Sequence, residues 1–179
     1  MEKIKEKQKK AYDALKESLG FKSPMEGVRI VKVVVNSGTG KQSRADKNKN
    51  DFVAERLTQL AGQKAAPRSA KKSIASFKLR EGEPIGQMVT LRGARMHDFL
   101  DRFFNVAIPR IRDFRGFSKT AVDAMGNLTI GIREHTIFPE TADDEIKDVF
   151  GLSVTIVTTA GTREAALAFF EHLGIPFKK

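Results

Sequence analysis

The apolar residues follow two different spacings along the chain, and this alternation constrains the fold more than any other feature. They recur every three or four positions in the segments predicted to be helices: residues 3–19, 46–61, 95–112 and the stretch from Thr162 to Gly174. They alternate with polar residues, or form β-branched runs, in the segments predicted to be strands: residues 28–35, 74–79, 85–92, 128–132 and 153–159. The predicted order is therefore α-β-α-β-β-α-β-β-α.

This order contains neighbouring strands but few β-α-β units, so it favours antiparallel pairing. The predicted fold class is α+β: a single-domain sandwich over residues 1–179, with a largely antiparallel sheet covered by helices on one face. Strand alternation places a set of side chains on the uncovered face: Lys32, Asn36, Ser76, Lys78, Thr90 and Arg92. Such a face suits an RNA backbone and unpaired bases, and it suits plain solvation equally well.

The distribution of charge points to a polyanionic partner. The 179 residues include 32 Lys and Arg and 22 Asp and Glu, which gives a net charge of +10. Residues 1–100 carry the whole basic excess, which favours nucleic acid ahead of a membrane. The chain has no cysteine, which excludes disulfides and cysteine-based metal sites. No apolar run approaches the roughly 20 residues of a membrane helix, and we expect a cytoplasmic protein without a membrane partner.

A glycine-rich segment, Asn36–Ser43, lies between a predicted strand and a predicted helix. A P-loop would need a glycine where the chain has Val35, and a serine or threonine where it has Gln42. A nucleotide-dependent enzyme that uses Gly38–Lys41 is therefore only the alternative hypothesis. Gly38 and Gly40 still allow a phosphate to approach the backbone closely, with Lys41 beside them.

Three further segments are candidates for binding. Gln63–Lys72 is a basic, extended segment that suits phosphate contacts, although it can also be a solvated loop. Phe77–Gly82 is the predicted tip of a hairpin, in which the alternation of Phe77 with Ala75 and Leu79 favours a core position for the ring. Pro109–Lys119 interleaves arginines with phenylalanines, a composition typical of RNA stacking or of a protein interface.

Catalytic and metal-binding patterns are not found. His97, His135 and His172 lie far apart and lack metal-ligand spacing. The acidic cluster at residues 143–145 is interpreted as solvated, because no nucleophile or base motif accompanies it. We therefore expect no enzymatic activity, no metal site and no cofactor.

Several blocks of sequence occur together in one order: Val33–Gly40, Ser73–Gly86, Thr90–Met96, Phe99–Arg102, Pro109–Glu140 and Thr155–Gly161. With these blocks the chain closely resembles the family of the universal large-subunit ribosomal protein number five, in its bacterial form. The resemblance covers nearly the whole chain, and the block Pro109–Glu140 is its most specific part. It implies an α+β sandwich that binds 5S rRNA and seats it in the central protuberance. It also implies contacts with 23S rRNA, neighbouring large-subunit proteins, peptidyl-site tRNA and protein number thirteen of the small-subunit head.

The resemblance assigns roles to three groups of residues. The candidate 5S rRNA-binding set combines residues that match the family with residues of the glycine-rich and basic segments. It consists of Asn36, Gly38, Gly40, Lys41, Gln63, Arg68, Lys71, Lys72, Thr90 and Arg92. The loop that the resemblance places near tRNA contains Lys78, Leu79, Arg80, Glu81 and Gly82. The small-subunit bridge contains Arg110, Arg112, Phe114, Arg115 and Phe117. A general RNA chaperone, which would bind unrelated RNAs equally, is a further alternative.

Overall fold

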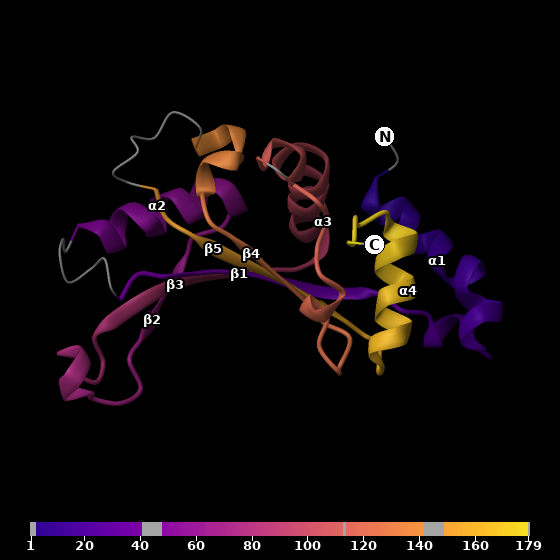
Figure 1. The fold of residues 1–179 in the computed structure, drawn as a ribbon, viewed down its shortest axis with the longest axis horizontal. Coiled ribbons are helices and arrows are strands. Elements are labelled where there is room, and N and C mark those ends of the chain that lie inside the picture. Colours follow the sequence, from indigo (N-terminus) through magenta and orange to yellow (C-terminus); the bar gives the residue numbers. More distant parts are fainter. Residues whose placement is uncertain (1–2, 41–47, 113, 142–148, 179) are drawn as a thin grey trace. The chain divides into compact units, whose positions relative to one another are not determined.

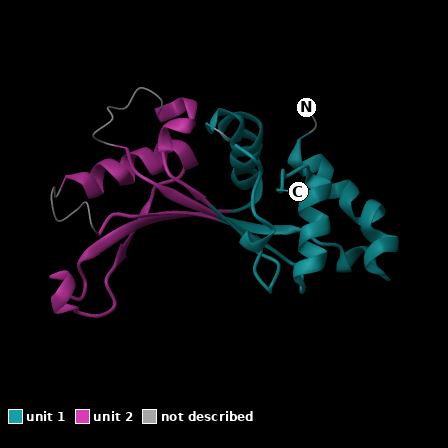
Figure 2. Cartoon of the chain, viewed as in Figure 1, with its two compact units in different colours: residues 1–33, 92–130, 155–179 teal, residues 34–91, 131–154 magenta. Residues whose placement is uncertain are grey.

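The computed structural model describes residues 3–40, 48–112, 114–141 and 149–178. The chain divides into two compact units (Figure 2). Unit 1 comprises Met1–Val33, Arg92–Ile130 and Thr155–Lys179, and unit 2 comprises Val34–Leu91 and Gly131–Val154. The boundary between the units falls inside three strands. The expectation of one domain over residues 1–179 stays a prediction.

The helices and strands of the described residues follow the predicted order (Figure 1). They are α1 Ile4–Leu19, β1 Ile30–Gly38, α2 Lys49–Ala61, β2 Ala66–Ser69, β3 Pro84–Leu91, α3 Gly93–Arg102, β4 Leu128–Ile132, β5 Leu152–Thr158 and α4 Arg163–Leu173. The strands form one antiparallel sheet in the order β2-β3-β1-β5-β4. The sheet is open and helices pack on it, so the predicted α+β class is confirmed.

Unit 1 contains a helical core in which α1 packs against α4 and α3. Its largest fully buried side chains are those of Phe99, Phe103, Phe169 and Phe170. Left-handed glycines end two of the helices, Gly20 after α1 and Gly174 after α4, as the sequence predicts. None of the helices in the described part of the chain is both long and apolar enough to span a membrane.

The hydroxyl of Thr162 caps the first turn of α4, which confirms the predicted helix start. Thr162 Oγ1 accepts a hydrogen bond of 3.3 Å from the backbone N–H of Ala165. We expect Thr162→Ala to lower the free energy of unfolding by about 1 kcal/mol, because that N–H loses its partner. Urea denaturation measures the change, and Thr162→Ser should retain most of the stability. An unchanged midpoint in Thr162→Ala would show that the cap does not contribute.

Unit 2 places α2 on the part of the sheet that contains β3. The apolar face of α2 buries Val53, Leu57 and Leu60, and Gly62 ends the helix in the left-handed conformation. Burial alternates along the unit 2 part of β1: Val35 and Ser37 are buried, whereas Asn36 and Gly38 are exposed. In unit 2, one face of the sheet is therefore covered and the other faces solvent.

The predicted strand over residues 74–79 is wrong. These residues form a 3₁₀ turn, η2 Ala75–Phe77, and an isolated bridge joins Ile74 to Leu79. The strand that pairs with β3 is instead β2, which lies inside the basic segment Gln63–Lys72. Ser76 and Lys78 consequently do not belong to the open sheet face, and Phe77 is 56% exposed rather than in the core.

Two other boundaries differ from the predictions. Strand β1 continues through Asn36 to Gly38, because its neighbours in the sheet supply pairing that the glycine pattern does not reveal. The helix expected over 95–112 runs as α3 to Arg102, widens into a π-helical turn, η3 Phe103–Ala107, and finishes as the 3₁₀ turn η4 Ile108–Arg110. Pro109 has no N–H to donate, and this last turn ends one residue later, at Arg110.

Candidate nucleic-acid interface

The open face of unit 2 gathers hydrogen-bonding side chains from three adjacent strands. Asn36 is exposed on β1, while Thr90 on β3 and Ser153 on β5 are half-buried. In each strand the flanking residues are buried: Val35 and Ser37, Val89 and Leu91, Leu152 and Val154. The polar side chains therefore share the face opposite to the core.

The side chain of Asn36 is held in a fixed orientation. Ser153 Oγ donates a hydrogen bond of 2.8 Å to Asn36 Oδ1. The amide nitrogen of Asn36 has no acceptor among the residues that the structure describes. Its two N–H groups are therefore free for the acceptor oxygens of a ligand.

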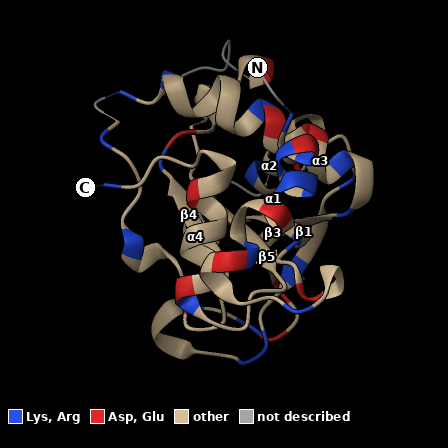
Figure 3. Cartoon of the chain, turned by 90° about the vertical axis from the view of Figure 1, so that its right-hand side faces the viewer, with Lys and Arg blue, Asp and Glu red and all other residues tan. Residues whose placement is uncertain are grey.

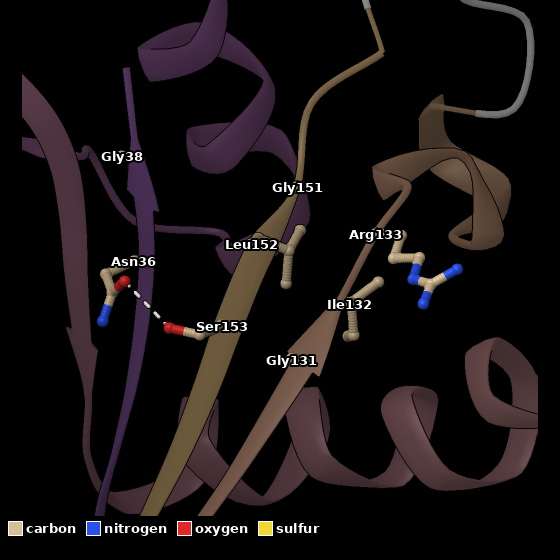
Figure 4. A pocket seen from close by; sticks show the side chains of 8 residues that line it. All are labelled: Asn36, Gly38, Gly131, Ile132, Arg133, Gly151, Leu152 and Ser153. Atoms are coloured by element: carbon tan, nitrogen blue, oxygen red, sulfur yellow. Dashed lines mark hydrogen bonds between the residues drawn. The ribbon is translucent and has the colours of Figure 1, made fainter. Parts of the chain in front are cut away.

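A hollow of about 460 Å³ adjoins Asn36 and Ser153 (Figure 4). Two of its glycines, Gly38 and Gly131, leave backbone uncovered along its lining, because a Cβ at either position would meet nothing within 4 Å. Arg133, directly after β4, is exposed and supplies a guanidinium. Amide, hydroxyl, guanidinium and bare backbone are the groups that hydrogen-bond to RNA phosphates and sugars. Sequence reasoning missed Arg133 and Ser153, although Arg133 follows a well-predicted strand.

The basic strand β2 pairs with β3 and extends the polar face to the edge of the sheet. All four of its residues are exposed, and Arg68 lies opposite Gly86 in the register. Arg68 Nη2 lies 3.5 Å from the sulfur of Met88, which places the guanidinium beside β3. Lys71 and Lys72 follow as exposed side chains. The cations of this edge are exposed, and contact with phosphates stays a prediction for the segment.

The structure brings Gln63 and Thr90 together, as a shared surface requires. Gln63 follows α2, and its Nε2 donates a hydrogen bond of 3.2 Å to the backbone oxygen of Thr90.

Gly38 has open space around it, whereas the N–H of Gly40 is occupied by a hydrogen bond of 3.0 Å to the Ile85 oxygen. Gly40 therefore has no N–H for a phosphate. Lys41 lies outside the described residues.

Arg92 lies in unit 1, where it occupies the N-cap position of α3 directly after β3. Its side chain is exposed and makes no capping hydrogen bond. Helix α3 itself carries both signs of charge: Arg95, Asp98, Asp101 and Arg102 (Figure 3). Arg92 is thus a cation at the beginning of a helix of mixed charge.

The predicted bridge residues also lie in unit 1. Arg110, Arg112 and Arg115 are exposed, whereas Phe114 and Phe117 are half-buried. The two rings pack edge to face with their centroids 5.0 Å apart. Backbone hydrogen bonds of 2.8 Å tie Phe117 to Pro176 and to Lys178. This segment therefore presents arginines from a well-anchored loop.

In the part of the chain that the structure describes, the histidines are not grouped as metal ligands. Within the described ranges, no group of three or more His, Cys, Asp or Glu side chains could hold a metal ion. His135 is fully buried in unit 2, and its ring stacks on Phe150 at 4.0 Å between centroids. In unit 1, burial and the Lys5 charge lower the pKa of His97. The acidic residues 143–145 lie outside the described part of the chain.

Comparison with known proteins supplies the family. The family model for the C-terminal part of ribosomal protein L5 matches residues 84–177, and the model described as "Ribosomal protein L5" matches residues 23–80. The large ribosomal subunit protein uL5 of Mesoplasma florum is 52% identical over 161 residues, which cover 90% of this chain and 89% of that protein. The protein of the same name from Herpetosiphon aurantiacus is 50% identical over 165 residues, with 92% of each chain covered. The chain belongs to the uL5 family.

Membership of the uL5 family confirms the resemblance inferred from the sequence, including its bacterial form. It makes the chain a structural constituent of the large ribosomal subunit. The family is structural, so the prediction that the chain is not an enzyme is confirmed. The nucleotide-dependent enzyme is therefore discarded, and ribosomal RNA and neighbouring ribosomal proteins are the expected partners.

Proposed function

We propose that this uL5 protein binds 5S rRNA through the open face of unit 2 and attaches it to the central protuberance. The observation that carries the proposal is the set of hydrogen-bonding groups on three adjacent strands, Asn36, Thr90 and Ser153, next to the basic strand β2. Oriented donors read the shape and the 2′-hydroxyls of RNA, while the cations supply affinity that falls with salt. Arg92, the cation that follows β3, contributes a further contact.

Two other contacts complete the proposed role. The loop of Lys78, Leu79, Arg80, Glu81 and Gly82 contacts peptidyl-site tRNA, because it presents cations at the free end of the β2–β3 pair. The segment of Arg110, Arg112, Phe114, Arg115 and Phe117 bridges to protein number thirteen of the small-subunit head. Contacts with 23S rRNA and the neighbouring proteins of the central protuberance hold the protein in the large subunit.

Binding to 5S rRNA, compared with a length-matched unrelated structured RNA at two salt concentrations, tests the main proposal. We expect 5S rRNA to bind more tightly at both concentrations, because hydrogen bonds to a specific shape survive added salt better than phosphate contacts do. Equal binding that falls in parallel with salt would refute a selective site. It would support the general RNA chaperone instead.

Replacing Arg92 by alanine is expected to weaken 5S rRNA binding roughly tenfold, by removing one charged contact. Filter binding or fluorescence anisotropy with labelled 5S rRNA measures the loss. Lys9→Ala removes the same charge from an exposed position on α1 and should leave the affinity nearly unchanged. If both variants lose the same affinity, Arg92 contributes only general charge.

A further inference from the structure

The connection between β2 and β3 ends in a tightly hydrogen-bonded turn, here called the tip turn, residues 74–79. The backbone N–H of Ile74 donates to the Leu79 oxygen at 3.0 Å, and the N–H of Leu79 donates back at 3.2 Å. Inside this ring, the N–H of Lys78 donates to the Ala75 oxygen at 2.9 Å. Lys78 takes a left-handed φ of 46°, which is costly for a residue with a side chain. The backbone therefore holds one defined shape.

The segments that lead into and out of the tip turn are also fastened to each other. The N–H of Ala70 donates to the Glu83 oxygen at 2.9 Å, and the N–H of Gly82 donates to the Ala70 oxygen at 3.1 Å. Ser73 Oγ accepts a hydrogen bond of 2.9 Å from the N–H of Glu81. The side chains of the tip turn are consequently presented on a rigid support.

This support exposes two large apolar side chains. Phe77 is 56% exposed and Ile74 is 41% exposed. Burial of a phenylalanine side chain is strongly favourable, and a ring left in solvent forgoes that stabilisation. An aromatic ring that a rigid turn holds in solvent is therefore a candidate for binding a partner.

The charges around the ring indicate what the partner is. Lys71, Lys72, Lys78 and Arg80 are all exposed in this loop. The acidic residues of the loop are Glu81 and Glu83. Glu83 is half-buried and accepts a hydrogen bond of 3.2 Å from the backbone N–H of Arg80. An aromatic ring among cations suits RNA, because the ring stacks on a base while the cations contact the adjacent phosphates.

We propose that Phe77 is a stacking platform for an unpaired nucleobase of the RNA that the tip turn contacts. The inference rests on the proposed function in one respect, namely that this loop contacts RNA, and it adds the residue and the mode of contact. A base inside a duplex has no free face, so the tip turn selects RNA loops over continuous helices. The alternative partner for the Phe77 ring is an apolar surface of another protein.

The absence of tryptophan from the sequence allows a direct test. Phe77→Trp preserves an exposed aromatic ring and places the only tryptophan of the full-length chain at the tip turn. The probe is an RNA hairpin whose loop contains unpaired adenosines, compared with a fully paired duplex of equal length. Met25→Trp is the matched control, because Met25 is 81% exposed and lies outside the tip turn. We expect the hairpin, and not the duplex, to quench the fluorescence of the Phe77→Trp variant only.

Affinity measurements separate stacking from charge. Phe77→Leu should weaken hairpin binding roughly tenfold, whereas Phe77→Tyr should retain it. Lys72→Gln should weaken the hairpin and the duplex alike and reduce the salt dependence. If Lys72→Gln has this effect while Phe77→Leu binds normally, stacking is refuted and the RNA contact stands. If neither variant changes binding and no quenching occurs, both the stacking and the proposed RNA contact of this loop are wrong.

Discussion

Asn36→Asp is expected to weaken the binding of 5S rRNA by about 30- to 150-fold, or about 2–3 kcal/mol. Aspartate has nearly the same shape as asparagine, and its carboxylate can still accept the hydrogen bond that Ser153 Oγ donates at 2.8 Å. Strand β1 should therefore be preserved. The substitution removes two free N–H donors from the open face and adds a negative charge beside RNA phosphates.

The same substitution elsewhere in the chain provides the control. Asn105 is exposed in unit 1, outside the proposed 5S rRNA face, so Asn105→Asp changes the net charge by the same amount. We expect Asn105→Asp to lose at most a few-fold in affinity. Both variants should show the circular dichroism spectrum of the unmodified protein. Equal losses in the two variants would mean that general charge, and not a face centred on Asn36, determines binding.

The fold class was predictable because local patterns and tertiary burial agree over most of the chain. In β4 the alternation of Leu128, Ile130 and Ile132 matches their burial, and Gly131 between them is exposed. Helix ends were predictable because a capping hydroxyl or a left-handed glycine acts through neighbouring backbone atoms. Thr162 and Gly62 are the clearest examples.

Strand β2 could not be predicted, because nothing in its own composition favours a strand. Its sequence is APRS, and every residue is exposed. Pro67 has no N–H to donate, which is tolerated only because β2 is an edge strand. Pairing with β3, a tertiary effect, selects this segment. The apolar alternation at residues 74–79 was stronger but misleading, because that segment hydrogen-bonds to itself.

The candidate interface was predictable only in part. Asn36 and Thr90 follow from alternation together with the family resemblance, and the structure puts them on adjacent strands. Ser153 and Arg133 were missed because their proximity to Asn36 depends on the sheet order, in which β5 lies between β1 and β4. A pattern within one strand carries no information about which distant strand becomes its neighbour.

Gly126→Ala is expected to lower the free energy of unfolding by about 2–4 kcal/mol. Gly126 has a φ of +79°, which strains any residue with a side chain. A methyl group there would also lie 2.8 Å from both the Cβ and the backbone oxygen of Ala160. The backbone of Ala160 cannot move freely, because Thr158 holds it next to Gly126. Thr158 Oγ1 donates a hydrogen bond of 2.7 Å to the Gly126 oxygen and accepts one of 3.2 Å from the Ala160 N–H.

Gly62→Ala separates backbone strain from steric clash, the two contributions to the stability that Gly126→Ala is expected to lose. Gly62 has a similar φ of +64°, but an added Cβ would meet nothing within 4 Å. It should therefore cost only the backbone strain, about 1 kcal/mol. Urea denaturation of both variants gives the difference, which measures the steric term in the buried turn at Gly126. Equal losses would show that Ala160 moves aside, and that the close packing of this turn adds nothing to the requirement for a left-handed glycine.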